Sequence, residues 1–291
     1  MKKVSVIIVN YNTARILKDC LQNLDSSYPN LETIVVDNGS KDNSVEIVKK
    51  FFPKVVLIEA ENKGLAAGSN LGLSKATGDY ILYLGSDAFP EKGTIHGMVE
   101  YMEEDPSIGI ATCRLVLRNG ALDKDAHRGF PTPWTALTHF MYLDRIFSKS
   151  KLFNRYFLGF MDMEKPHEID MCISHFMLVK KEVFERVGKW DEDYFLYGED
   201  VDFCYRVKQS GYRITYLPQF KAVHYKGASV GIRKETQDIS KVDEESKRKN
   251  RQRTIEAMKI FYKKHMYKKY PWAVNKLVEL GINLMDAVRA A

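Results

Sequence analysis

Residues 80–90 read Tyr80-Ile81-Leu82-Tyr83-Leu84-Gly85-Ser86-Asp87-Ala88-Phe89-Pro90, and this stretch indicates how the chain folds. Its first five residues are large and uncharged, and the run stops at a Gly-Ser turn, which is typical of a buried strand. Asp87 is therefore expected at the carboxyl end of that strand, where open parallel α/β sheets bind their ligands. A carboxylate there can hold a divalent cation against a phosphate, or it can simply close the strand as a turn residue.

Three strand–helix units precede this stretch. Apolar runs at 4–9, 31–36 and 55–59 predict strands, and helices are expected from Ala14, over 42–52 and over 62–72. Glycines in the third helix indicate that something approaches its backbone closely, because glycine lowers helix propensity. Three consecutive crossovers predict a Rossmann-like, mainly parallel sheet flanked by helices. Asp37 ends the second strand as Asp87 ends the fourth, so both acids are expected along one edge of the sheet.

The strand–helix alternation stops in the second half of the chain. A helix is expected over 91–104, strands over 108–117, 169–179 and 212–217, and a short helix over 182–188. Residues 131–166 are rich in aromatic residues with cations between them, which predicts helices packed on the body, with a minority of rings facing an acceptor or a lipid.

Six of the twelve residues in 191–202 are carboxylates, and aromatic residues lie between them. Apolar residues at helical spacing after Asp200 place Glu199 and Asp200 in the first turn of a helix. The helix dipole there would lower the pKa of a carboxylate, whereas burial by the neighbouring rings would raise it. His224 follows the last expected strand, where a single histidine is usually structural.

Composition excludes several classes of protein. The chain has 291 residues, four scattered cysteines and nothing at its start that resembles a signal peptide, so a reduced, cytoplasmic protein is expected. No apolar run approaches the roughly 18 to 20 residues that cross a bilayer. The first strand is not followed by a G-x-G-x-x-G motif, which disfavours a dinucleotide site, and a P-loop is absent. The formal charge of +6 comes from residues 241–270, so the body is close to neutral and no nucleic-acid partner is expected.

Taken in order, these motifs resemble the inverting family 2 glycosyltransferases with a GT-A fold, and particularly their rhamnosyltransferase-like branch. The resemblance covers residues 4–229 and rests on 4–13, 36–40, 62–72, 84–90, 198–202 and His224. It implies a GT-A domain over 1–235, made of a nucleotide-binding half (1–105) and an acceptor and catalytic half (106–235) that carries a helical insert at 131–166. Residues 236–291 would form a basic, amphipathic, helical tail.

The resemblance also implies roles for particular residues. Asp200 corresponds to the catalytic base and Glu199 to its neighbour, which binds or orients the acceptor together with Trp190 and Asp191. Asp87 and His224 correspond to ligands of Mg²⁺ or Mn²⁺, although Gly85 stands where the family has a first acid. The residues expected to bind the nucleotide sugar are Asn10, Asn12, Asp37, Asn62, Gly64, Asn70, Ser86 and Asp87, with Asp37 reading the pyrimidine.

The predicted reaction is a metal-assisted single displacement in cell-surface polysaccharide synthesis. It moves a sugar from dTDP-rhamnose, or from a UDP-sugar, to a hydroxyl of a glycan or lipid-linked acceptor. A non-catalytic module that binds a sugar nucleotide or a partner, and a nucleotidyltransferase, are the alternatives.

The tail carries eleven Lys or Arg residues against four acids in 241–270, followed by an amphipathic run. A cationic helix with aromatic residues suits an anionic membrane surface, here the inner face of the cell membrane. A helical pair that packs on the body or on a second subunit fits the same pattern.

Overall fold

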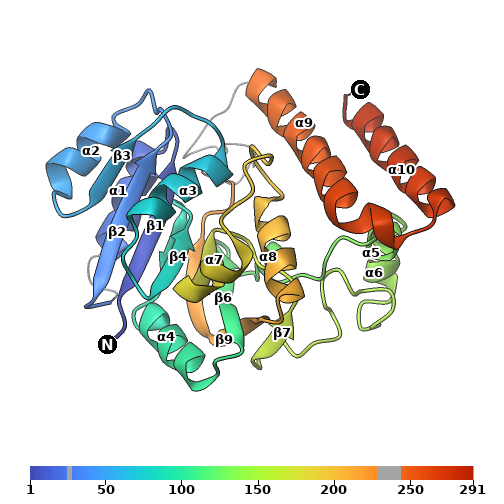
Figure 1. Ribbon diagram of the computed structural model, residues 1–291, viewed down its shortest axis with the longest axis horizontal. Helices are drawn as coiled ribbons and strands as arrows, with labels where there is room; N and C mark the ends of the chain where they lie inside the picture. Colours follow the sequence, from blue (N-terminus) through green and yellow to red (C-terminus); the bar gives the residue numbers. More distant parts are fainter. Residues whose placement is uncertain (25–27, 228–243, 291) are drawn as a thin grey trace.

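The computed structural model describes residues 1–24, 28–227 and 244–290. Within them, nine strands form one sheet in the order β3-β2-β1-β4-β8-β6-β9-β5, and β7 pairs with β9 (Figure 1). The strands are β1 (Val4–Asn10), β2 (Leu31–Asp37), β3 (Val56–Glu59), β4 (Tyr80–Leu84), β5 (Ala88–Pro90), β6 (Ile108–Leu117), β7 (His167–Ile169), β8 (Phe176–Lys180) and β9 (Arg213–His224). The helices are α1 (Ala14–Leu24), α2 (Ser44–Phe51), α3 (Leu65–Lys75), α4 (Thr94–Glu104), α5 (Pro133–Phe140), α6 (Leu143–Ile146), α7 (Lys181–Val187), α8 (Glu199–Gln209), α9 (Glu244–Phe261) and α10 (Trp272–Ala290).

Strands β3, β2, β1 and β4 are parallel, as the three predicted crossovers require. Beyond β4 the sheet is mixed, because β8 runs antiparallel to both β4 and β6, while β6 and β9 are parallel. The predicted fold class, an α/β protein with a mainly parallel sheet and C-terminal helices, is confirmed.

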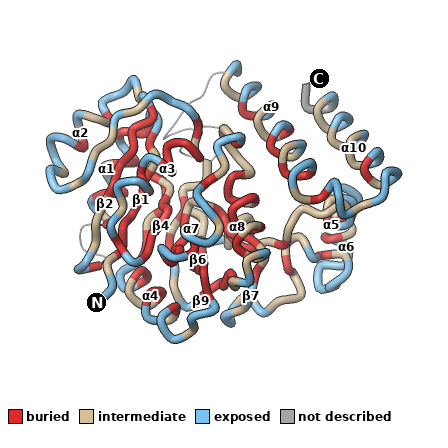
Figure 2. Tube along the Cα trace, in the orientation of Figure 1, coloured by how far each residue is buried: buried red, intermediate tan, exposed pale blue. Residues whose placement is uncertain are grey.

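Both faces of the sheet are covered by helices. Val6 and Ile8 of β1 pack with α1, α2 and α4, whereas Ile7 packs with α3, α7 and α8 on the opposite face. All three residues are at most 1% exposed, and Figure 2 shows the central strands as mostly buried. A strand covered on both sides needs no polar alternation, which explains the continuous apolar run at 4–9.

The glycines of α3 let the helix lie directly on the sheet. A Cβ on Gly68 would lie 2.8 Å from Cγ1 of Val9, and one on Gly72 would lie 2.5 Å from Cγ2 of Ile7. The predicted close approach is therefore confirmed, and the approaching group is the protein's own first strand.

The structure corrects three expected elements. The strand predicted over 169–179 is two strands, because β7 pairs with β9 whereas β8 pairs with β4 and β6. The strand predicted over 212–217 continues to His224, because a shift of register opposite Cys113 and Arg114 lets it pass Pro218, and a bulge tolerates proline. The insert at 131–166 is helical only in α5 and α6 and otherwise consists of turns and irregular backbone.

The C-terminal helices pack on the body at the end of the molecule away from α2 (Figure 1). Ala257, Phe261, Tyr262 and Met266, from α9 and the π-helical turn η3 (Tyr262–Met266), form a small core with Tyr194 and Tyr205. The sequence left three packing partners open for the tail: a membrane surface, the body and a second subunit. In the structure, α9 packs on the body. The expected boundary at residue 236, the end of the family resemblance at Ser229 and the start of the basic run lie outside the described residues.

Helix α10 packs against α9 and leaves an apolar face exposed. The exposed side chains on it are Trp272, Leu277, Leu280 and Leu284. Among the described helices, none combines the length and the apolar character needed to cross a membrane.

Candidate active site

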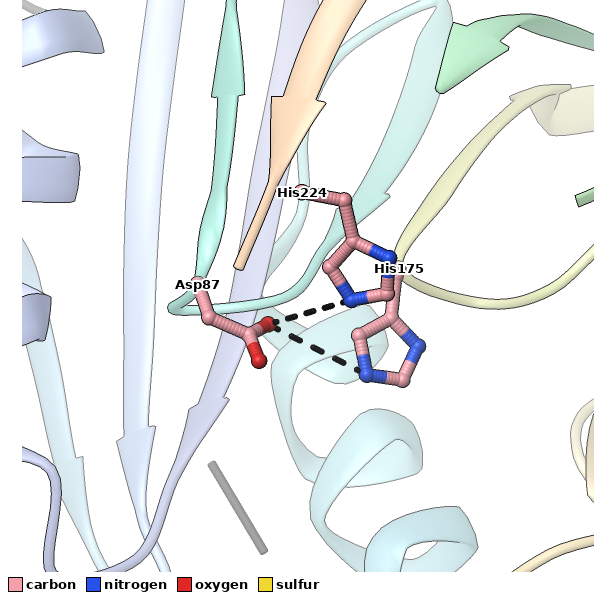
Figure 3. Close-up of side chains that lie close together, drawn as sticks. All are labelled: Asp87, His175 and His224. Atoms are coloured by element: carbon pink, nitrogen blue, oxygen red, sulfur yellow. Dashed lines mark ion pairs between the residues drawn. The ribbon is translucent and has the colours of Figure 1, made fainter. Parts of the chain in front are cut away.

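Three strand ends bring Asp87, His175 and His224 together (Figure 3). Asp87 lies between β4 and β5, and the pairing of Ala88 with His224 places the end of β9 beside it. The backbone N–H of Tyr225 donates to the carbonyl of Asp87 at 2.8 Å, and the N–H of Gly85 donates to the carbonyl of His175 at 3.0 Å. Backbone register therefore fixes the positions of all three side chains.

The three ligand atoms lie within 4.8 Å of one another. Oδ1 of Asp87 is 3.7 Å from Nε2 of His224 and 3.9 Å from Nε2 of His175. Two atoms that each bind one ion at about 2.1 Å can be at most about 4.2 Å apart, so both separations are compatible with a shared ion. The side chains of Asp87 and His224 are buried, whereas that of His175 is 31% exposed.

Asp123 holds His224 in the orientation that a metal ligand requires. Nδ1 of His224 lies 2.8 Å from Oδ2 of Asp123. Within the described part of the chain, the buried Nε2 of His224 makes no hydrogen bond, and it faces Asp87. Burial raises the pKa of Asp123, but the hydrogen bond from His224 and the charge of Lys226 outweigh it and hold the pKa well below its usual range. A carboxylate that bonds the far nitrogen of a metal-binding histidine is the usual outer partner of such sites, so the residues present fit a divalent metal.

We call Asp87, His175 and His224 together the metal corner. The residues at the ends of β1 and β2 that are predicted to bind the nucleotide sugar form one hydrogen-bonded network, and this network reaches the metal corner. Nδ2 of Asn10 donates to Oδ2 of Asp37 at 2.9 Å, and Thr13 donates to Oδ1 of Asn10. Oγ1 of Thr13 lies 3.1 Å from Oγ of Ser86, the neighbour of Asp87. The expectation that Asp37 and Asp87 lie along one edge of the sheet agrees with this network.

The other predicted donor residues have structural partners. Asn12, in the left-handed conformation with φ 54°, accepts a hydrogen bond from the N–H of Lys41 at 2.7 Å. Asn62 is exposed and accepts from the N–H of Gly64 at 3.1 Å. A Cβ on Gly64 would lie 2.4 Å from the carbonyl oxygen of Phe195, which explains the glycine without a ligand.

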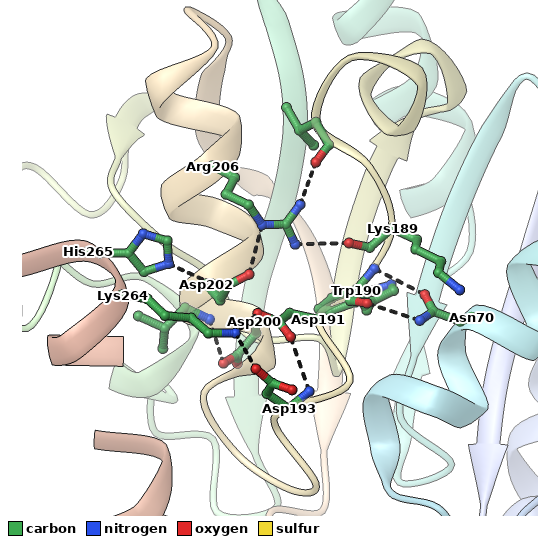
Figure 4. A network of polar contacts seen from close by, with 12 residues as sticks. Asn70, Lys189, Trp190, Asp191, Asp193, Asp200, Asp202, Arg206, Lys264 and His265 are labelled. Atoms are coloured by element: carbon green, nitrogen blue, oxygen red, sulfur yellow. Dashed lines mark hydrogen bonds and ion pairs between the residues drawn. The ribbon is translucent and has the colours of Figure 1, made fainter. Parts of the chain in front are cut away.

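Asn70 holds the segment around residue 190 in place (Figure 4). Its Nδ2 donates to the carbonyl of Trp190 at 3.0 Å and to Glu192 at 2.7 Å, and its Oδ1 accepts from the N–H of Trp190 at 3.0 Å. The donor contacts predicted for Asn12, Asn62, Gly64 and Asn70 stay predictions.

Glu199 and Asp200 begin α8 as predicted, and both are buried. Backbone N–H groups of Ser174 and Val201 donate to the carboxylate of Asp200. Because Ser174 precedes His175, the carboxylate of Asp200 lies at the same edge of the sheet as the metal corner.

Burial dominates the protonation of this pair. Burial, followed by the charge of Asp200, raises the pKa of Glu199 to about 8. Burial also raises the pKa of Asp200, but the charge of Arg128 and the backbone donors oppose that effect. At neutral pH the raised pKa keeps the proton on Glu199, whereas Arg128 and the backbone donors favour the ionised form of Asp200.

Sequence reasoning missed three residues of this region, His175, Asp123 and Arg128. His175 directly precedes the apolar run of β8, and Asp123 starts a short acidic turn, so neither stood out by itself. Arg128 donates to the hydroxyl of Tyr156 at 2.8 Å, and its charge acts on Asp200. The only sequence signal is that His175 directly precedes β8 and Asp123 follows the end of β6, and Arg128 has no such signal.

Trp190 is a core residue, and its predicted acceptor contact stays a prediction. Its side chain is 2% exposed, and its ring lies against Tyr83 at 4.7 Å and Phe203 at 4.8 Å between centroids. The alternating pattern of acids and rings in the sequence does not show which side chains are buried. In the structure Trp190 faces the core, while its polar neighbours face outward.

Most of the acidic segment binds cations of the protein itself (Figure 4). Lys264 of η3 pairs with Asp191 and also with Asp193, the latter at 2.7 Å. Asp202 bonds Arg206 at 2.8 Å and Nε2 of His265 at 2.6 Å. Asp191 therefore has a structural partner, and its predicted acceptor contact stays a prediction.

Comparison with known proteins agrees with this arrangement. The family model described as "Glycosyl transferase family 2" matches residues 5–188. Rhamnosyltransferase WbbL of Escherichia coli (strain K12) is 27% identical over 237 residues, which cover 76% of this chain and 83% of that protein. Poly-beta-1,6-N-acetyl-D-glucosamine synthase of Staphylococcus aureus (strain COL) is 25% identical over 222 residues, or 75% of this chain and 48% of the synthase.

A solved structure has the same fold. The mannosyltransferase PcManGT from Pyrobaculum calidifontis, in complex with GDP-Man and Mn²⁺, superposes with a TM-score of 0.54 at 19% identity over 97% of this chain and 80% of that chain. This likeness confirms the predicted GT-A fold.

Proposed function

The chain belongs to glycosyl transferase family 2, and from that premise we propose an inverting transfer from a pyrimidine nucleoside diphosphate sugar to a hydroxyl of a glycan or lipid-linked acceptor. The favoured donor is dTDP-rhamnose, with a UDP-sugar as the second choice, and the pathway is cell-surface polysaccharide synthesis. One observation carries the proposal: the donor network, the metal corner and one buried carboxylate share one edge of the sheet. Family membership favours this reaction over a nucleotidyltransferase and over a non-catalytic module.

Asp37 would read the base of the donor. It is 3% exposed, and Asn10 and the N–H of Ser40 hold its two oxygens in place at 2.9 and 2.8 Å. A carboxylate acceptor suits the ring N–H that uracil and thymine share, and this contact does not distinguish one sugar from another. The similarity to rhamnosyltransferase WbbL supports the choice of rhamnose.

Asp200 would act as the general base. It takes the proton of the acceptor hydroxyl while that oxygen attacks the anomeric carbon and the bond from this carbon to the diphosphate oxygen breaks. Glu199 keeps its proton at neutral pH because of its raised pKa, so it can donate a hydrogen bond to the acceptor. A single displacement inverts the anomeric centre, and it requires no covalent nucleophile.

Asp87 and His224 would hold Mg²⁺ or Mn²⁺ beside the diphosphate. A bound cation stabilises the negative charge that develops on the leaving group. The orientation of His224 by Asp123 supports this role, as does the Mn²⁺ in the complex of PcManGT.

A peripheral position on an anionic membrane would bring the enzyme to a lipid-linked acceptor. The exposed face of α10 is apolar, and a second exposed apolar group lies on α5, α6 and the turns after them, at the same end of the molecule (Figure 1). Members of the second group are Trp134, Leu137, Phe140, Met141, Tyr142, Ile146, Phe147 and Leu152.

Since α9 packs on the body, the membrane proposal is tested on α10. Replacing both Leu277 and Leu284 by Ser should reduce sedimentation with phosphatidylglycerol vesicles. Equal binding of the variant and the parent chain would refute the proposal.

A donor screen tests the central proposal. Nucleoside diphosphate release and thermal shifts are measured with dTDP-rhamnose, UDP-glucose and GDP-mannose in the presence of Mn²⁺. We expect stabilisation by the two pyrimidine nucleotides only. Asp37→Asn should bind them about tenfold more weakly, because a hydrogen bond to a charged group is lost. Asp19→Asn, at an exposed position of α1, is the matched control. Equal stabilisation by the guanine nucleotide would contradict the choice of a pyrimidine donor, and unchanged binding in Asp37→Asn would contradict the role of Asp37.

A further inference from the structure

The space around Gly85 is occupied by the metal corner. A Cβ at this position would lie 2.7 Å from Cδ2 of His175 and 2.8 Å from Oδ1 of Asp87. The backbone of Gly85 does not adopt the left-handed conformation, so its φ does not require glycine. Any larger residue here would have to displace the side chains of His175 and Asp87, because they fill the volume that its own side chain would use.

Backbone hydrogen bonds hold His175 in that volume. Phe176 pairs with Leu84, and the N–H of Gly85 donates to the carbonyl of His175 at 3.0 Å. The imidazoles of His175 and His224 have centroids 4.7 Å apart, and each Nε2 lies within 4 Å of Oδ1 of Asp87. Both separations exceed the 2.7–3.2 Å of a hydrogen bond and are compatible with two ligands of one ion.

We propose that His175 is a third protein ligand of the metal and takes the place of an acid at position 85. The site then offers one carboxylate oxygen and two imidazole nitrogens. Imidazole suits first-row transition ions, whereas Mg²⁺ and Ca²⁺ prefer oxygen ligands. The site therefore selects a first-row ion such as Mn²⁺ over Mg²⁺. This inference rests on the metal site of the proposed function, but not on the sugar or on its transfer.

Mn²⁺ binding to the full chain without a donor tests the ligand set. Electron paramagnetic resonance follows the loss of free Mn²⁺, and electron spin echo modulation counts the coordinated nitrogens. We expect two nitrogens in the unmodified chain and one in His175→Asn. The affinity should fall by about 100-fold in the variant, since even outer partners of metal ligands contribute about 10- to 100-fold. His167→Asn, which removes a half-buried imidazole outside the site, should change neither measurement.

A double substitution tests the selectivity. Gly85→Asp with His175→Ala exchanges nitrogen for oxygen in the same volume, so Mg²⁺ should compete with Mn²⁺ more strongly than in the unmodified chain. Gly85→Asp alone should lose Mn²⁺ affinity, because its side chain meets His175. Fewer than two nitrogens in the unmodified chain, or unchanged binding in His175→Asn, would overturn the inference. Two nitrogens without any nucleoside diphosphate release would instead contradict only the proposed function.

Discussion

Two groups of acids within residues 191–202 differ in what surrounds them. Asp191, Asp193 and Asp202 bond Lys264, Arg206 and His265, and two of these three partners come from η3. Glu199 and Asp200 are buried at the start of α8, where the charge of Arg128 acts on Asp200. The first group therefore attaches the C-terminal helices to the body, whereas the second group is the pair to which the proposed function assigns the acceptor hydroxyl.

The difference shows how to distinguish structural acids from reactive ones. The pKa of Asp202 lies below its usual value because, although burial raises it, His265 and Arg206 lower it further. The pKa of Glu199 is raised because burial is not offset by a cation. Neighbouring carboxylates whose pKa values move in opposite directions have different tasks.

Asp200→Asn should have the largest effect on activity. Loss of a general base lowers turnover by about 10²- to 10⁴-fold, whereas stability should not fall, because a buried charge is removed. Nucleoside diphosphate release under saturating donor and acceptor measures the effect, and thermal shift with the donor checks that binding remains. Unchanged turnover would remove Asp200 from the mechanism.

Asp202→Asn should give the opposite result, a large loss of stability with turnover per folded molecule retained. The substitution keeps the shape but removes charged hydrogen bonds to Arg206 and His265, which should lower the free energy of unfolding by about 1.5–3 kcal/mol. Urea denaturation measures this change. A loss of turnover at full stability would show that the two groups of acids are not separate.

Glu199→Gln should change how stability depends on pH. The pKa of Glu199 is about 8 in the folded chain against an ordinary value of 4.5, so between these values the unfolded chain binds fewer protons. The free energy of unfolding contributed by this group therefore falls as pH rises through that window. Urea denaturation at several pH values should show a weaker fall in the variant than in the parent chain. Glu185→Gln, on the exposed side of α7, should keep the slope of the parent, and an equal slope in Glu199→Gln would refute the assignment.

Lys264→Ala should have the smallest effect. Its two ion pairs are partly exposed, with Lys264 at 34% and Asp193 at 68%, so their loss should cost about 0.2–1 kcal/mol. Turnover should not change. A marked loss of turnover in this variant would instead connect the C-terminal helices to the reaction.

Much of the site could be predicted, because its residues follow stretches that are recognisable as strands. Asp37 and Asp87 follow apolar runs, and parallel strands bring their carboxyl ends to one edge. Trp190 could not be placed, because an aromatic residue among acids gives no periodicity that separates a core position from a surface one. His175 was missed because its ligand partners lie far away in the sequence, and only the antiparallel pairing of β8 with β4 brings it to Gly85.

The parallel half of the sheet, the edge on which Asp37 and Asp87 lie, and the start of α8 at Glu199 can be predicted without a structure. These features follow from local patterns, namely apolar runs, turn residues and helical spacing. Which acids pair with cations, and whether Asp87, His175 and His224 meet, is visible only in the folded chain. Charge pairing and ligand geometry depend on contacts between distant segments, such as η3 against 191–202 and β9 against β5, and no local pattern encodes such contacts.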